Sequence, residues 1–305
     1  MGILKSSPQA RPIGQSSLRV FPIAYGCWRF RSGSVHEARG KIEAAVEVGV
    51  QLFDHADIYG GAGAAEELFG RVLHENPTLR RFMVVATKCG IVPGVPYDAS
   101  YLHLVRGAEE SLRRLKCEVI DLFFVHRYDF LAHPEETARA LEQLRQEGKI
   151  REAGVSNYTP SQAATLQRFL PFPLAAHQRE WSCTWPNVLL DGTVDQCFSL
   201  GLGLLAWSPL AGGKLLLSVE QAQREHNASV LVPVMEKLDE LAQRYGTDRA
   251  AVALSFLLVH PVGAIPIVGT QRVERIRRLR QVFDVRWERH DWYAVLQAGL
   301  GRKLP

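Results

Sequence analysis

Residues 120–126 read Ile-Asp-Leu-Phe-Phe-Val-His, and a short connection leads to residues 134–146, Pro-Glu-Glu-Thr-Ala-Arg-Ala-Leu-Glu-Gln-Leu-Arg-Gln. The first stretch is a nearly continuous apolar run, which is typical of a strand that is buried on both faces. In the second stretch Ala138, Leu141 and Leu144 recur at helical spacing and would line one face of a helix. The pair therefore predicts a strand followed by an amphipathic helix, the unit from which parallel sheets are built.

The same unit recurs along the whole chain. We expect strands at Val20–Tyr25, Gln51–Asp54, Phe82–Lys88, Ile120–His126, Glu152–Val155, Leu174–His177, Gly203–Trp207 and Ala264–Val268. We expect helices at Val35–Val48, Ala64–Glu75, Ala99–Leu115, Pro134–Gln146, Pro160–Leu170, Asp191–Leu200, Val232–Tyr245 and Arg272–Arg280. Eight such units favour an α/β fold whose strands close into a (β/α)8 TIM barrel over a doubly wound sheet. Trp287–Leu300 predicts an extra C-terminal helix outside the barrel.

The layout of the chain indicates a single domain over residues 1–305. No linker rich in Pro, Gly or Ser divides it. A dinucleotide-binding open sheet is the alternative, because its strands alternate with helices in the same way. However, Gly60-Gly61-Ala62-Gly63 lacks the full G-x-G-x-x-G pattern and follows the second strand instead of the first. A loop before a helix accounts for these glycines.

The bulk properties exclude several classes of protein. The chain has 305 residues, 47% of them hydrophobic and 22% charged, so it can bury a large core. Its net charge of +4 gives no reason to expect nucleic acid or a membrane as a partner. The five cysteines are scattered and odd in number, and no secretory pattern opens the sequence, which favours a cytoplasmic protein with reduced thiols. We also expect a monomer or a weakly associating oligomer. No apolar run reaches the ~20 residues of a membrane span, and no grouping of His, Cys and carboxylates has the spacing of a metal site.

Polar side chains stand where the predicted strands end. Asp54, Lys88 and His126 each close an apolar run. In a TIM barrel the carboxyl ends of the strands meet at one rim, where active sites lie. Each residue also has a purely structural interpretation, since Asp54 could cap a helix, Lys88 could be solvated and His126 could be a core histidine. A lysine that follows a buried strand is costly unless it is paired, and Asp54 is its expected partner.

The segment Phe53-Asp54-His55-Ala56-Asp57-Ile58-Tyr59-Gly60 resembles the signature of the aldo-keto reductase superfamily. The blocks Ala86-Thr87-Lys88, Asp121-Leu122-Phe123-Phe124-Val125-His126 and Gly154-Val155-Ser156-Asn157 match the family in order and spacing. Lys88-Cys89-Gly90 looks like bacterial members of an uncharacterised-oxidoreductase type. The resemblance implies an NADPH-dependent oxidoreductase that reduces aldehydes and ketones to alcohols.

The resemblance assigns the chemistry to four residues. Carbonyl reduction takes a hydride from the nicotinamide and a proton from the protein. The resemblance gives the proton to Tyr59, whose ordinary pKa of about 10 makes it a weak acid. Lys88 would lower this pKa and Asp54 would balance the lysine, while His126 would orient the substrate oxygen.

The resemblance also implies a site for NADPH (NADP+). The residues expected around the nicotinamide are Ser156, Asn157, Gln178 and Trp207. Those expected in the pyrophosphate loop are Ser208, Leu210, Gly212 and Lys214. Those expected at the adenosine end are Gly269, Thr270, Arg272, Arg275 and Arg278. The arginines would bind the 2′-phosphate, although Gln271 and Leu279 depart from the family pattern and a solvated basic face is the alternative.

Aromatic residues would form the substrate pocket. Trp28 matches a pocket wall of the family, and Tyr128 is the second candidate, to which Phe130 and Trp181 could add. Such a pocket suits a small carbonyl compound with a hydrophobic body. Two other functions stay open, namely an aldolase or lyase that forms a Schiff base at Lys88, and a non-enzymatic subunit that senses a cofactor.

Overall fold

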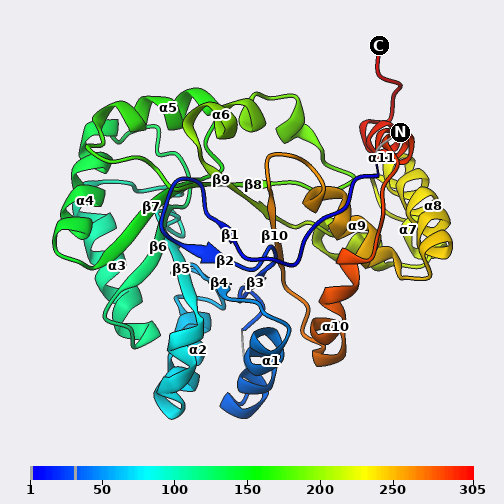
Figure 1. Ribbon diagram of the computed structural model, residues 1–305. Helices are drawn as coiled ribbons and strands as arrows, with labels where there is room; N and C mark the ends of the chain where they lie inside the picture. Colours follow the sequence, from blue (N-terminus) through cyan, green and yellow to red (C-terminus); the bar gives the residue numbers. More distant parts are fainter. Residues whose placement is uncertain (1–2, 31–32) are drawn as a thin grey trace.

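Parallel strands close into a barrel in the computed structural model, which describes residues 3–30 and 33–305 (Figure 1). The eight strands of the barrel are β3 Ala24–Gly26, β4 Leu52–Asp54, β5 Val84–Cys89, β6 Ile120–Val125, β7 Ile150–Ser156, β8 Ala176–Glu180, β9 Gly203–Trp207 and β10 Ile265–Val268. Each strand pairs in parallel with the next, and β10 pairs with β3 to close the ring. The predicted α/β class and TIM barrel are therefore confirmed, and the open-sheet alternative is wrong.

Helices surround the barrel. They are α1 Val35–Glu47, α2 Ala64–Glu75, α3 Tyr101–Leu115, α4 Pro134–Gln146, α5 Pro160–Phe169, α6 Thr193–Leu200, α7 Val219–Ala222, α8 Ala228–Tyr245, α9 Arg249–Leu258, α10 Val273–Arg277 and α11 Arg289–Leu300. Short 3-10 helices lie at η1 Pro77–Phe82, η2 Asn187–Leu189, η3 Ala211–Leu216 and η4 Arg278–Phe283. The extra C-terminal helix is α11, which packs on α8 (Figure 1). Within the described residues, no helix combines the length and the apolar character that crossing a bilayer requires.

The connection between β9 and β10 differs from the prediction of one helix at Val232–Tyr245. It holds two long helices, of which α8 packs against α11 while α9 packs against β10 and takes the place of the barrel helix. Eight of the ten residues of α9 are buried. Because α9 lies between the barrel and the outer helices, it has no polar face, and its sequence shows no amphipathic period to predict it.

The first predicted strand, Val20–Tyr25, is also wrong in its bounds. Val20 belongs to an antiparallel hairpin of β1 Arg11–Pro12 and β2 Arg19–Val20, and Pro22, which has no N–H to donate, separates β2 from β3. Ile13 in the hairpin is fully buried and packs with the apolar side chains of the barrel interior. The hairpin therefore covers the amino ends of the strands, opposite their carboxyl ends (Figure 1).

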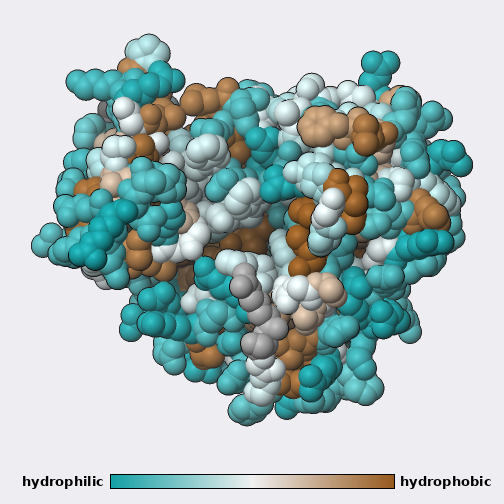
Figure 2. Space-filling model, turned by 180° about the vertical axis from the view of Figure 1, so that it is seen from behind, coloured by the Kyte–Doolittle hydropathy of each residue, from teal (hydrophilic) through white to brown (hydrophobic). Residues whose placement is uncertain are grey.

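The carboxyl ends of the strands carry the polar residues that the sequence singled out. Asp54 is the last residue of β4, Lys88 is the penultimate residue of β5, and His126 directly follows β6. Neighbouring strands run in register here, with Asp54 opposite Ala86 and Lys88 opposite Phe124. The face of the molecule turned away from the viewer in Figure 1 is hollowed near its centre (Figure 2).

Candidate active site

Lys88 lies at the centre of the candidate site and is fully buried. Its ammonium donates hydrogen bonds to both carboxylate oxygens of Asp54, at 2.8 and 2.7 Å, and to the backbone carbonyl of His55 at 2.7 Å. It also lies 3.2 Å from the hydroxyl oxygen of Tyr59. The ring of His126 stands edge-on to the Tyr59 ring, with centroids 6.0 Å apart. The structure thus brings together the four side chains of the expected tetrad.

The surroundings of Lys88 keep it charged. Burial alone would lower the pKa of Lys88, but the Asp54 carboxylate and the Tyr59 hydroxyl outweigh burial and raise it above the ordinary value. An ammonium cannot attack a carbonyl carbon. The Schiff-base alternative is therefore disfavoured by the same contacts that hold Lys88 in place.

The pKa of Tyr59 differs from the expectation. Burial raises it above its ordinary value, and the opposing effect of Lys88 does not cancel this rise. The pKa of His126 lies well below its ordinary value, because the ring is buried and lies close to the Lys88 ammonium. At neutral pH the site therefore holds a protonated tyrosine and a neutral histidine.

A second buried ion pair, between Glu66 and Arg114, holds β5 in place through Thr87. Glu66, in the first turn of α2, accepts hydrogen bonds from the Thr87 hydroxyl and from the Arg114 guanidinium of α3. Gly63 directly precedes α2 at positive φ, and a Cβ there would lie 2.4 Å from Arg114 Nε, so glycine is favoured at this close approach. Because Thr87 precedes Lys88 in β5, this network holds the lysine strand against both helices.

The residues expected around the nicotinamide are linked by hydrogen bonds. The Gln178 amide donates to Asp54 Oδ1 at 2.8 Å. The Asn157 amide nitrogen lies 2.9 Å from Ser156 Oγ, and the Asn157 amide oxygen accepts from the Trp207 indole at 3.0 Å. The Asn157 backbone N–H donates to the Gln178 carbonyl at 3.0 Å, so these residues and the tetrad share one network at the rim.

A groove of about 770 Å³ leads away from the tetrad between β9 and β10. Its walls include Ser208, Leu210, Gly212, Gly269, Thr270, Arg272, Arg275 and Arg278. Positive φ values recur in one wall, at Ser208, Gly212 and Gly213. Turns of this kind can present backbone N–H groups to an anion.

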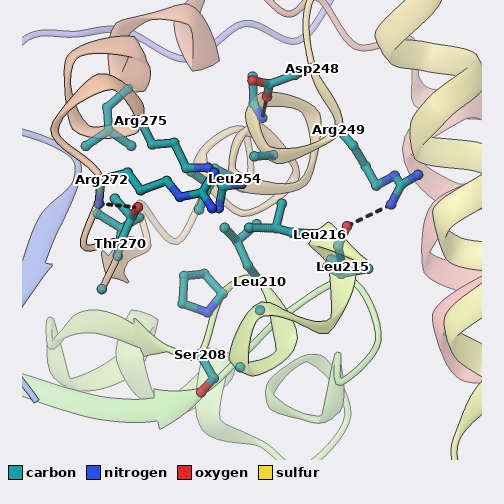
Figure 3. Close-up of a pocket in the computed structure, with 18 of the residues that line it drawn as sticks. Ser208, Leu210, Leu215, Leu216, Asp248, Arg249, Leu254, Thr270, Arg272 and Arg275 are labelled. Atoms are coloured by element: carbon teal, nitrogen blue, oxygen red, sulfur yellow. Dashed lines mark hydrogen bonds between the residues drawn. The ribbon is translucent and has the colours of Figure 1, made fainter. Parts of the chain in front are cut away.

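Two arginines meet at the far end of the groove. The guanidinium groups of Arg272 and Arg275 lie side by side and point toward Leu254 and Leu210 (Figure 3). Among residues 3–30 and 33–305, neither group has a carboxylate within ion-pair distance. Two neighbouring cations without counter-charges favour an anionic ligand at this end over a solvated basic face.

Lys214 is not brought to the groove, in contrast to the expectation. Its ammonium forms an ion pair with Glu225 at 2.6 Å, and the residue does not line the cavity. Arg29 stands at the groove instead. Its guanidinium donates to the carbonyls of Gly269 at 3.3 Å and Gly212 at 3.2 Å, and it stacks on the Trp28 ring at 4.4 Å. The only sequence signal for Arg29 is its place next to Trp28.

A smaller cavity of about 290 Å³ opens at the tetrad. Trp28 lines both this cavity and the groove, and Ile58, Tyr59, Gly60 and Gly61 line the rest of the small cavity. Tyr128 lies on the loop after His126, where its ring packs edge-on against Phe130 and Tyr158. Trp181 cannot add to the pocket, because it is fully buried and packs against His260 behind the rim.

Comparisons with known proteins agree with this geometry. The family model described as "Aldo/keto reductase family" matches residues 22–298. A 6-dehydroglucose reductase of Novosphingobium aromaticivorans is 43% identical over 312 residues, covering 100% of both chains. The oxidoreductase YdhF of Escherichia coli K12 is 35% identical over 92% of this chain and 94% of its own. A solved thermostable aldo-keto reductase, Tm1743 with the inhibitor epalrestat, has the same fold, with a TM-score of 0.80 at 22% identity over 95% of this chain and 99% of that chain.

These matches support an oxidoreductase that reduces carbonyl groups. They span the barrel and every strand that carries a tetrad residue. The protein belongs to the aldo/keto reductase family.

Proposed function

We propose that the protein reduces an aldehyde or ketone to an alcohol with NADPH, and that Tyr59 donates the proton. The observation that carries this proposal is the fully buried Lys88 ammonium, 3.2 Å from the Tyr59 hydroxyl and held by Asp54. A buried ammonium beside a phenol has a clear use in this reaction, because it stabilises the phenolate that proton donation leaves behind.

The pKa directions fit this order of events. Tyr59 must be protonated when the substrate binds, and the rise of its pKa through burial ensures that it is. As the substrate oxygen gains charge it takes the phenolic proton, and the negative charge on Tyr59 then lies next to Lys88. His126 stays neutral because its pKa is lowered, so it donates a hydrogen bond to the oxygen and does not compete as an acid.

The residues of the groove fit NADPH. When bound, the cofactor supplies the hydride for the carbonyl carbon. The side chains of Ser156, Asn157 and Gln178 offer donors and acceptors to its carboxamide, and the turn at Gly212 suits a diphosphate. The neighbouring guanidinium groups of Arg272 and Arg275 suit the 2′-phosphate, which only NADPH carries.

We further propose that the substrate is a hydroxylated aldehyde, and 6-dehydroglucose is the first to test. The relative with 43% identity over its whole length bears this substrate in its name. Charged side chains at the rim support the proposal. Arg127 follows His126, and Glu180 ends β8 close enough to Arg127 for its charge to act on the glutamate. Together they offer hydrogen bonds to sugar hydroxyl groups. The apolar substrate expected from the sequence is the competing possibility.

The test of the proton donor is Tyr59→Phe, assayed by NADPH oxidation with 6-dehydroglucose and a panel of apolar aldehydes. We expect turnover to fall by about 10²–10⁴-fold, the usual contribution of a general acid, while NADPH affinity measured by fluorescence stays within about twofold. Tyr245→Phe, on α8 away from the rim, is the control and keeps full turnover.

Three results would count against these assignments. Near-normal turnover of Tyr59→Phe would show that another group donates the proton. Failure of the wild-type protein to bind NADPH would refute the proposed cofactor. Faster reduction of the apolar aldehydes than of 6-dehydroglucose would refute the proposed substrate class.

A further inference from the structure

Three potential metal ligands converge behind the tetrad. They come from separate elements: Asp57 from the loop after β4, Cys89 from the end of β5, and His103 from the first turn of α3. One ligand atom from each lies within 4.8 Å of the other two. The gaps of 32 and 14 residues between them match no familiar metal-binding motif, which is why the sequence predicted no metal site.

Two polar atoms in this cluster are buried without partners. Among the described residues, Asp57 Oδ1 and His103 Nε2 are both shielded from solvent and accept or donate no hydrogen bond. Buried polar atoms are rarely left without a hydrogen bond, and binding an ion is one way to satisfy them. The Cys89 thiol is free, lies beside the Asp57 carboxylate and donates to the backbone carbonyl of His103 at 3.9 Å.

The surroundings position the three side chains. A Cβ added to Gly107 of α3 would lie 2.3 Å from Cys89 Sγ, so the thiol packs tightly against this helix. Asp98 Oδ2 lies 3.9 Å from His103 Nδ1. A carboxylate behind a histidine is the common arrangement that orients its other nitrogen toward a metal.

We propose that Asp57, Cys89 and His103 form a Zn²⁺ site. One thiolate, one imidazole and one carboxylate form a tetrahedral set typical of zinc, with water as the fourth ligand. The ion replaces the thiol proton, which passes to solvent. Zinc–ligand distances of about 2.0–2.3 Å place the ligand atoms ~3.5 Å apart, so binding draws the three side chains together.

Zinc at this site would act on the tetrad through the backbone. The Asp57 N–H donates to the Lys88 carbonyl at 3.0 Å, and the His126 N–H donates to the Cys89 carbonyl at 2.9 Å. Asp57 also precedes Tyr59 by two residues. A pull on the Asp57 and Cys89 side chains therefore shifts the segments that hold Lys88, Tyr59 and His126, and we expect Zn²⁺ to inhibit turnover reversibly.

The test measures metal binding directly on the full chain without an affinity tag. Competition with a chromophoric chelator gives the Zn²⁺ affinity, and Co²⁺ serves as a spectroscopic probe whose thiolate absorption reports coordination by Cys89. We expect one ion per chain, and a loss of affinity of about tenfold or more in Cys89→Ser and in His103→Gln. His74→Gln and Cys117→Ser, which lie outside the cluster, are matched controls and keep wild-type affinity.

The outcomes separate cleanly. A wild-type chain without the cobalt–thiolate absorption, or equal affinities in all five proteins, would overturn the site. His103 is partly exposed, so His103→Gln tests the proposal even if Cys89→Ser fails to fold. Inhibition that a chelator reverses in the wild type and that is absent in His103→Gln supports the link to the tetrad. Zinc binding without inhibition would overturn that link.

Discussion

The tetrad and the groove lie at the same rim, but they differ in whether their positively charged side chains already have partners. At the tetrad, Lys88 is fully buried and its ammonium already has Asp54, the His55 carbonyl and Tyr59 as partners. In the groove, Arg272 and Arg275 are exposed to the cavity and have no carboxylate partner among the described residues (Figure 3).

This difference indicates which part of the site the fold completes by itself. A buried ammonium needs its counter-charge for the barrel to be stable, so the pair of Lys88 and Asp54 must form when the chain folds. The groove carries no such requirement, because solvent can hydrate its cations until an anion binds. Substitutions at the tetrad should therefore cost both stability and turnover, whereas substitutions in the groove should cost affinity alone.

The largest effect should come from Lys88→Met, which removes the buried ammonium of the tetrad. The variant leaves Asp54 buried with the Gln178 amide as its remaining side-chain partner. Breaking a buried pair from one side typically costs about 3–5 kcal/mol, so we expect a loss of this size in the free energy of unfolding by urea. Turnover should fall by at least about 10³-fold, because the phenolate of Tyr59 loses its stabilising charge.

The double variant Asp54→Asn with Lys88→Met is the control for Lys88→Met. It removes both charges, so much of the lost stability should return while turnover stays absent. A double variant as unstable as Lys88→Met alone would show that packing, and not the unpaired carboxylate, causes the loss.

Much of the barrel could be predicted because its elements repeat a local pattern. Strands such as Ile120–Val125 are short apolar runs, and α4 has an apolar stripe at helical spacing. The elements that were not predicted correctly are those whose formation depends on tertiary packing. The helix α9 is apolar on all sides because it is enclosed by other elements. The β1–β2 hairpin packs against the closed barrel, and a local sequence pattern does not predict the shape of that surface.

The residues of the candidate site also fall into those that a local pattern predicts and those that depend on the fold. Asp54, Lys88 and His126 could be found because each ends a buried strand, and the carboxyl ends of barrel strands must converge. Arg29 could not be assigned to the groove, since its contacts with Gly212 and Gly269 join residues more than 180 positions away in sequence. The ion pair of Lys214 with Glu225 could not be predicted, because it depends on the fold of η3 and the following loop; the role of Lys214 at the diphosphate stays a prediction.

The second prediction concerns the arginines of the groove, and its expected effect is of intermediate size. Replacing Arg272 and Arg275 together by alanine should weaken NADP+ binding by about 10–100-fold, since each charge-assisted contact to a phosphate contributes about 1.5–3 kcal/mol before losses to solvent exposure. The affinity for NAD+, which lacks the 2′-phosphate, and the free energy of unfolding should stay unchanged. Isothermal titration and urea unfolding measure these quantities.

Arg277→Ala is the matched control for the pair. Arg277 lies on α10 together with Arg275, but its guanidinium pairs with Glu47 outside the groove. Its removal should leave the affinities for both cofactors within about twofold. Equal losses for NADP+ and NAD+ in the double variant would assign the arginines to a part of the cofactor other than the 2′-phosphate.

The smallest expected effect comes from comparing two cations near the groove, Arg29 and Lys214. Among the described residues Arg29 contacts backbone carbonyls and an aromatic ring but no carboxylate, so its charge is available to a diphosphate, whereas the charge of Lys214 is paired with Glu225. Arg29→Ala should lower NADP+ affinity about tenfold, and Lys214→Ala should change it by less than about twofold. Neither variant should alter the affinity for adenosine 2′-monophosphate, which has no diphosphate. A larger loss in Lys214→Ala would mean that the Glu225 ion pair opens when the cofactor binds, and the cations of the groove would then be arranged by the ligand and not by the fold.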